Sequence, residues 1–85
     1  MTDAPVGELR KRSFSIAGHR TSVALEPEFW TVLQAEAHEE RLPLTAIVAR
    51  VDQARGDRNL ASALRVHVLM RALGKAAPSF SAGLF

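Results

Sequence analysis

The sequence contains no cysteine, which excludes disulfide bonds and thiolate metal ligands. It has no uninterrupted apolar run of about 18 residues or more, so we expect no membrane-spanning helix. The first residues lack the basic and then apolar layout of a secretory signal, and we expect residues 1–9 to form a flexible leader. These absences together favour a cytoplasmic protein.

Signals of catalysis are also scarce. The three histidines, His19, His38 and His67, are too scattered along the chain to form a local metal motif. All five glycines are isolated, so the sequence contains no glycine-rich phosphate loop. The neighbouring Glu39 and Glu40 are typical of a solvated helix end, and no serine stands in a nucleophile elbow. We therefore expect a protein that is not an enzyme and that carries neither a metal nor a cofactor.

The composition is sufficient for one small folded domain. Apolar residues make up 47% of the 85 residues, which is enough for a hydrophobic core and argues against a wholly disordered chain. A chain of this length buries little of its surface and is often marginally stable when alone. Self-association is therefore a reasonable expectation.

Two stretches of the sequence alternate between apolar and polar residues, which is the pattern of a β-strand. They are residues 12–16 and residues 20–25, and Gly18 between them can supply a positive φ. One face of the two strands is expected to carry Phe14, Ile16, Thr21, Val23 and Leu25. The other face is expected to carry Ser13, Ser15, Arg20, Ser22 and Ala24.

Three helices are predicted after the strands. A proline flanked by glutamates suits a helix start, and the first helix is expected at residues 27–41, before the break at Pro43. The second helix is amphipathic and stops near Gly56. The third helix is capped by Asn59 or Asp57 and is apolar on nearly all sides, so we expect a second subunit to cover it.

Basic residues lie on both sides of the acidic first helix. Nine of the eleven cations are arginine, which suits bidentate contact with phosphate or guanine better than lysine does. The later helices carry four arginines that form either a phosphate-binding surface or an ordinary solvated face. These are Arg50, Arg55, Arg58 and Arg65.

Four segments carry a resemblance to a known family. They are Lys11-Arg12-Ser13, Ile16-Ala17-Gly18-His19-Arg20-Thr21-Ser22, Leu25-Glu26-Pro27-Glu28-Phe29-Trp30, and Asn59-Leu60 with Ser62-Ala63-Leu64-Arg65-Val66. Together they resemble the ribbon-helix-helix family, to which the Arc and methionine repressors belong, and within it a short bacterial subfamily. The resemblance implies a mainly α-helical fold with an N-terminal strand or strand pair and three helices. It also implies that residues 10–73 form an intertwined homodimer with an intermolecular antiparallel β-ribbon. The composition of residues 74–85 predicts a loose tail after this domain.

The resemblance further implies a transcriptional regulator whose ribbon enters the major groove of double-stranded DNA. The base-facing residues would be Arg20, Ser22 and Ala24. The phosphate contacts would come from Arg10, Lys11, Arg12, Pro43, Leu44 and Thr45. The dimer core would contain Val23, Leu25, Phe29, Trp30, Leu33, Ile47, Val48, Val51 and Leu64. Ala24, which has no hydrogen-bonding group, and Pro43, which has neither hydroxyl nor N–H, depart from the family pattern.

The upstream strand leaves two geometries open. If residues 18 and 19 form a two-residue turn, Ala17 lies opposite Arg20, and a dimer carries a four-stranded sheet. Three strand spacings of about 4.8 Å plus side chains exceed a major groove about 12 Å wide, so such a sheet suits a protein partner better. Alternatively, residues 11–16 form a flexible basic arm along the DNA. The second functional hypothesis is accordingly a protein-interaction or antitoxin-like adaptor dimer that binds a protein partner.

Overall fold

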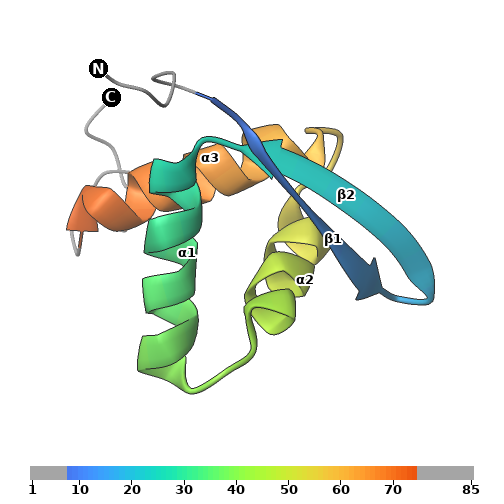
Figure 1. The fold of residues 1–85 in the computed structure, drawn as a ribbon, viewed down its shortest axis with the longest axis horizontal. Helices are drawn as coiled ribbons and strands as arrows, with labels where there is room; N and C mark the ends of the chain where they lie inside the picture. Colours follow the sequence, from blue (N-terminus) through green and yellow to red (C-terminus); the bar gives the residue numbers. More distant parts are fainter. Residues whose placement is uncertain (1–7, 75–85) are drawn as a thin grey trace.

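The computed structural model describes residues 8–74, which form a two-stranded antiparallel sheet followed by three helices (Figure 1). The elements are β1 (Arg10–Ile16), β2 (His19–Leu25), α1 (Pro27–Glu40), α2 (Leu44–Ala54) and α3 (Leu60–Ala72). The expected strand pair and three helices are therefore confirmed. Most of the leader predicted at residues 1–9 and of the tail predicted at residues 74–85 lies outside the described residues.

The two strands form a hairpin, so residues 11–16 belong to a sheet and the alternative of a free basic arm is wrong. Its turn consists of Ala17 and Gly18, whose φ angles are 52° and 82°. Two positive φ angles are characteristic of a type I′ hairpin turn, in which glycine is favoured at the second position. The turn predicted at residues 18 and 19 is therefore one position too late, and Ile16 pairs with His19.

The two faces of the hairpin nevertheless carry the predicted side chains. A shift of two residues along the partner strand returns every side chain to the same face, because the side-chain period of a strand is two. The inner face packs against the helices and buries Phe14, Ile16, Val23 and Leu25. The outer face is exposed to solvent at Lys11, Ser13, Ser15, Arg20 and Ser22.

Local sequence signals set the helix ends. Pro27 lies in the first turn of α1, and Arg41 ends that helix in the left-handed conformation with φ 58°. Asn59 rather than Asp57 caps α3, and its side-chain oxygen accepts a hydrogen bond of 2.8 Å from the Ser62 N–H. Among the residues that the structure describes, none of the helices has the length and apolar character needed to cross a membrane.

Most of the predicted dimer core is already buried within a single chain. Most of the side chains predicted for a dimer core are buried here, namely Val23, Leu25, Trp30, Leu33, Ile47, Val48, Val51 and Leu64, while Phe29 is partly buried. β1 adds Phe14 and Ile16 to this cluster, and α3 adds Val68. The extra strand and the extra helix therefore cover much of the core from within the chain, although α3 leaves Leu69 and Leu73 exposed.

Candidate nucleic-acid interface

The outer face of the hairpin is polar and basic. It consists of three cross-strand pairs, Lys11 with Ala24, Ser13 with Ser22, and Ser15 with Arg20. The hydroxyl oxygens of Ser13 and Ser22 lie 2.9 Å apart and share a hydrogen bond. All of these side chains are exposed except that of Ala24, which is partly buried. The face therefore presents hydroxyls and two cations, which are the groups that proteins direct at phosphates and base edges.

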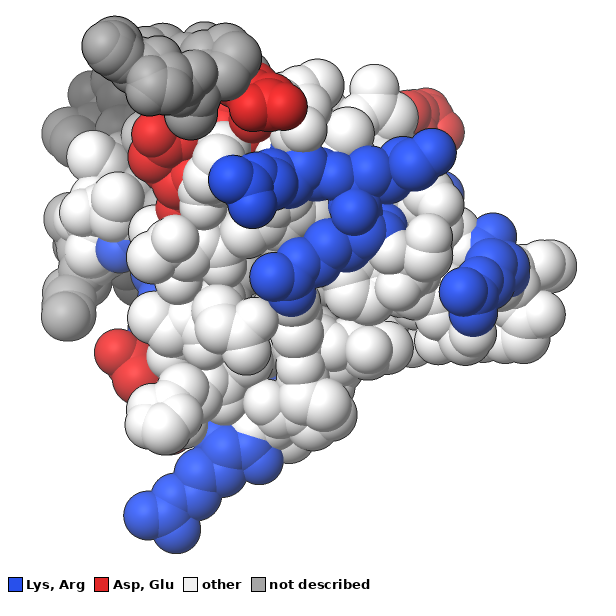
Figure 2. All heavy atoms as spheres, viewed as in Figure 1, with Lys and Arg blue, Asp and Glu red and all other residues white. Residues whose placement is uncertain are grey.

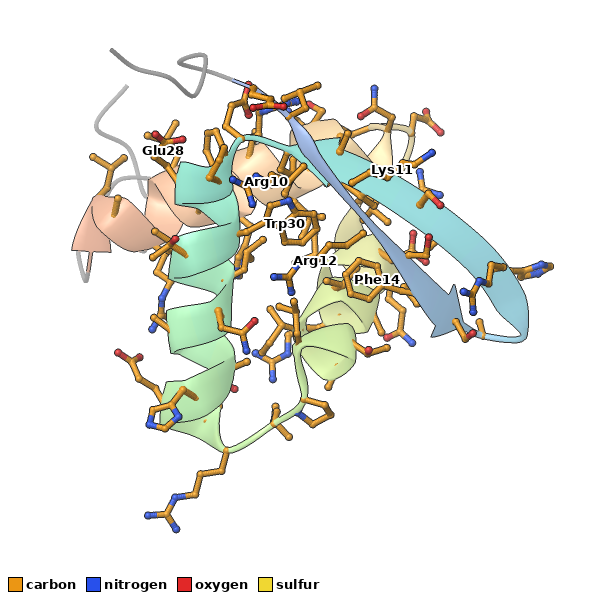
Figure 3. The ribbon with its side chains drawn as sticks, viewed as in Figure 1. Arg10, Lys11, Arg12, Phe14, Glu28 and Trp30 are labelled. Atoms are coloured by element: carbon orange, nitrogen blue, oxygen red, sulfur yellow. The ribbon has the colours of Figure 1, made fainter. Side chains whose placement is uncertain are left out.

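The basic residues at the start of β1 do not share one face. Lys11 lies on the outer face, whereas Arg10 and Arg12 lie on the inner face because side chains alternate along a strand. Figure 3 shows Arg12 directed toward Trp30, and its guanidinium carbon lies 5.3 Å from the centre of the indole. Of these three predicted phosphate contacts, only Lys11 thus lies beside the base-facing positions.

The helical body, defined here as residues 26–72, pairs most of its cations with carboxylates. The guanidinium groups of Arg50, Arg55 and Arg65 lie 2.9, 2.6 and 3.0 Å from carboxylate oxygens of Glu40, Asp52 and Glu26. The hydrogen bond with Arg50 holds the pKa of Glu40 below its usual value, and the same contact raises the pKa of Arg50. These three arginines are therefore already paired with carboxylates of the same chain.

The hairpin differs from the helical body in this respect. Among residues 8–74, its cations Arg10, Lys11, Arg12 and Arg20 form no ion pair with another described residue. Figure 2 shows lysine and arginine atoms gathered over the hairpin, on the face turned toward the viewer. The hairpin is therefore the largest group of cations that the described part of the chain leaves without carboxylate partners.

The predicted contacts at the start of α2 lie in the loop at the far end of α1 from the hairpin (Figure 1). Pro43 is exposed and extended, with φ −68° and ψ 152°, and its carbonyl accepts a 2.9 Å hydrogen bond from the Ala46 N–H. Leu44 and Thr45 are partly buried in the first turn. Within one chain, this loop and the outer face of the hairpin are thus two separate sites.

A buried carboxylate that sequence patterns did not reveal connects the three helices. Glu36 on α1 is only 2% exposed, and its Oε1 lies 2.7 Å from Nε2 of His67 on α3. Its Oε2 lies 3.9 Å from Arg50 of α2 and 3.8 Å from Arg71 of α3. No cluster of three or more side chains suited to hold a metal occurs within residues 8–74. The arrangement is therefore structural, since it supplies buried charge with partners from all sides.

Comparison with known proteins adds one finding. A family model described as the ribbon-helix-helix domain matches residues 9–72, which include both strands and all three helices. No curated protein and no solved structure matches the chain. The resemblance stated from the sequence segments is therefore confirmed over most of the chain.

Proposed function

The chain belongs to the ribbon-helix-helix family, whose members typically dimerise and bind DNA as transcription regulators or antitoxins, and on this premise we propose a homodimeric DNA-binding regulator. The family has a non-enzymatic DNA-binding fold, so no catalytic role is proposed. The DNA would be bound by the outer face of the hairpin.

The observation that carries this proposal is the contrast in charge between the hairpin and the helical body. Lys11 and Arg20 project from the exposed outer face without a carboxylate partner among the described residues. Phosphate oxygens would supply the missing negative charge, and release of condensed cations from DNA would favour the contact. The surrounding serine hydroxyls are neutral donors that can form hydrogen bonds with either phosphates or bases.

The free edge of β2 is the surface proposed for dimerisation. In the two-stranded sheet, β2 pairs on one side only, with β1, and its other edge has backbone N–H and C=O groups available to a further strand. Pairing of β2 with β2 of a second copy about a two-fold axis gives an antiparallel ribbon. This is the strand, residues 20–25, that the sequence predicts for the ribbon.

Such a dimer has a four-stranded sheet, which changes how it can contact DNA. Three strand spacings of about 4.8 Å exceed a major groove about 12 Å wide. We therefore place the sheet across the mouth of the groove. The central strands direct Arg20 toward base edges, where guanine offers two acceptors, and the outer strands place Lys11 over the phosphates. The start of α2, through the N–H groups of Leu44 and Thr45, would contact a further phosphate.

This geometry predicts strong salt dependence and modest sequence preference, because the contacts to phosphate outnumber the contacts to bases. The test is fluorescence anisotropy with labelled genomic duplexes at rising salt, alongside light scattering to measure mass. We expect a dimer whose affinity falls steeply with salt. An intact dimer that binds no duplex at low salt would exclude the proposal.

A further inference from the structure

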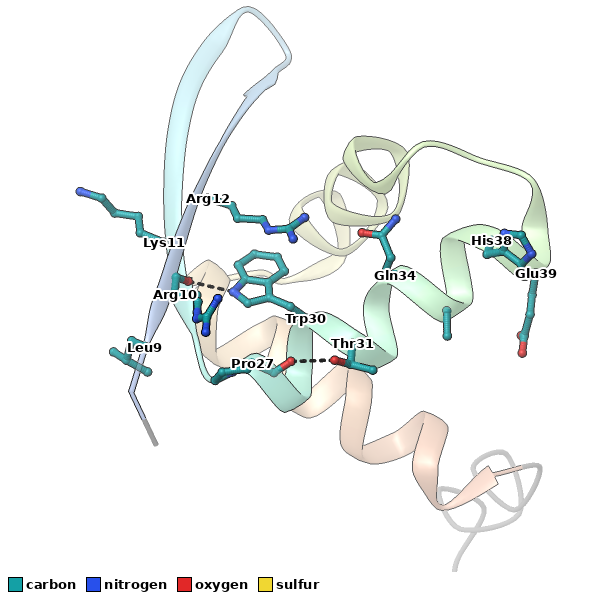
Figure 4. Close-up of a pocket in the computed structure, with 11 residues that line it drawn as sticks. Leu9, Arg10, Lys11, Arg12, Pro27, Trp30, Thr31, Gln34, His38 and Glu39 are labelled. Carbon is teal, nitrogen blue, oxygen red and sulfur yellow. Dashed lines mark hydrogen bonds between the residues drawn. The ribbon is translucent and has the colours of Figure 1, made fainter. Parts of the chain in front are cut away.

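A second basic surface lies on the other side of β1. An open groove of about 1060 Å³ runs between the start of β1 and the solvent-facing side of α1 (Figure 4). This volume is at the upper end of small-molecule pockets, which suits an extended segment better than a single small ligand. The side chains that matter most for its chemistry are Leu9, Arg10, Arg12, Trp30, Gln34 and Ala35.

The two walls of the groove differ in charge. Arg10, Lys11 and Arg12 line the β1 wall and form no ion pair within residues 8–74. The α1 wall carries uncharged Thr31, Gln34 and Ala35 through its middle. Its acidic residue, Glu39, lies at the far end and is paired with Arg71. The groove therefore has a positive wall facing a neutral wall, which complements a negatively charged occupant.

Arg12 is held in place before any occupant arrives. Its guanidinium lies over the indole of Trp30, a cation–π contact, at 5.3 Å from the ring centre. The indole is itself fixed by its hydrogen bond to the Arg10 carbonyl and by the Phe14 ring, 5.9 Å away. Figure 4 shows Arg12 and Trp30 together on one side of β1, with Lys11 on the other. Because the guanidinium is oriented in advance, less conformational entropy is lost on binding.

The environment of Trp30 argues against a nucleic acid in this groove. Stacking of a base requires an exposed aromatic face, but Trp30 is only 5% exposed and Arg12 covers its ring. The outer face proposed for duplex DNA is on the opposite side of β1. The remaining lining includes apolar Leu9, Pro27 and Ala35, which phosphate sites do not need.

We propose that this groove binds an acidic peptide segment of a partner protein, with carboxylates on Arg10 and Arg12 and an apolar side chain against Leu9 and Ala35. Guanidinium groups bind carboxylates through paired, charge-assisted hydrogen bonds. The groove adjoins β1, whereas the edge proposed for dimerisation belongs to β2. The inference goes beyond DNA binding and does not depend on it, because its two arginines lie on the inner face of β1, although Lys11 of the outer face also borders the groove.

The test follows the fluorescence of Trp30, the only tryptophan of the chain, in the full-length protein. One probe is a short peptide that alternates aspartate and leucine, and its control carries asparagine in place of aspartate. We expect a saturable change with the acidic peptide that weakens as salt is added, and none with the control peptide. A labelled duplex measured in parallel reports DNA binding separately.

Variants identify the site. Arg10→Gln leaves the Arg12–Trp30 contact in place. It is expected to lower the affinity for the acidic peptide about tenfold, because one charge-assisted contact is lost. Arg12→Gln should also lower the affinity for the acidic peptide about tenfold. Thermal unfolding checks that both variants fold. Arg58→Gln, an exposed arginine in the loop after α2, should leave the affinity unchanged. The proposal is overturned by equal responses to the two peptides, by unchanged affinity in both variants, or by a Trp30 response to duplex DNA alone.

Discussion

The helical body and the hairpin use their charges in opposite ways. In the helical body, Arg50, Arg55 and Arg65 each contact a carboxylate, whereas Lys11 and Arg20 of the hairpin contact none among the described residues. Exposed ion pairs contribute little to stability, but they cancel the charge that a phosphate would otherwise meet. The number of arginines in a segment is therefore a poor guide to a nucleic-acid surface. The number of arginines that lack a carboxylate partner is a better guide.

If this comparison is correct, charge changes in the helical body alter stability and charge changes in the hairpin alter binding. The largest effect is expected for Glu36→Ala, because the change removes a buried carboxylate from His67, Arg50 and Arg71. Hydrogen bonds to charged groups suggest a loss of about 2–3 kcal/mol in the free energy of unfolding. Urea denaturation measures this loss.

The matched control for this prediction is Glu28→Ala, an exposed carboxylate on the same helix. Its effect should stay within about 0.5 kcal/mol, as for most surface substitutions. The affinity of folded Glu36→Ala for DNA should match that of the unchanged chain. Equal stability losses for the two glutamates would show that the contacts of Glu36 are not structural.

The next effect concerns the hairpin. Arg20→Ala is expected to leave the free energy of unfolding within about 0.5 kcal/mol, because the side chain is exposed on the outer face. It should remove about 1–3 kcal/mol of discrimination between duplexes, the value of a bidentate arginine–guanine contact. Selection of preferred duplexes from a random pool measures the discrimination. An unchanged preference would show that Arg20 does not reach the bases.

The sequence predicted the faces of the hairpin better than its pairing. Period-two alternation assigned Phe14 and Val23 to the core, and that assignment is insensitive to a slip of two residues. The pairing depends on the turn, and the turn requires a positive φ at Ala17, which alternation does not reveal. The outward orientation of Arg20 was therefore predictable, whereas its partner Ser15 was not.

Two other features differ in how far the sequence could reveal them. Alternation extended back to residue 10 separates Lys11 from Arg10 and Arg12, so the sequence itself contains this signal. The contact of Glu36 with His67 joins residues 31 positions apart on two different helices. It depends on how α1 and α3 cross, which no local pattern contains.

A smaller effect is expected when one cation of the hairpin and one cation of the helical body are each replaced by alanine. Lys11→Ala removes two proposed phosphate contacts from a dimer, so the slope of log affinity against log salt should fall by about 2. Arg50→Ala removes a cation that already contacts Glu40, and its slope should not change. Anisotropy titrations at several salt concentrations measure both slopes. A reduced slope for Arg50→Ala would mean that ion pairing does not keep a helical arginine from DNA.

The smallest expected effect is the pH dependence of one exposed pair in the helical body. The Arg50 hydrogen bond lowers the pKa of Glu40 from its unperturbed value of 4.5, so the pair stabilises the fold fully above that pH. The stabilisation is lost as pH falls through the lower pKa of the folded state, where Glu40 takes up a proton. Glu40→Gln should therefore melt slightly below the unchanged chain at neutral pH, and the two should converge in acid. Thermal unfolding followed by circular dichroism from neutral pH downward measures the difference. A gap that stays constant with pH would show that the carboxylate charge contributes nothing and that Arg50 is held by packing alone.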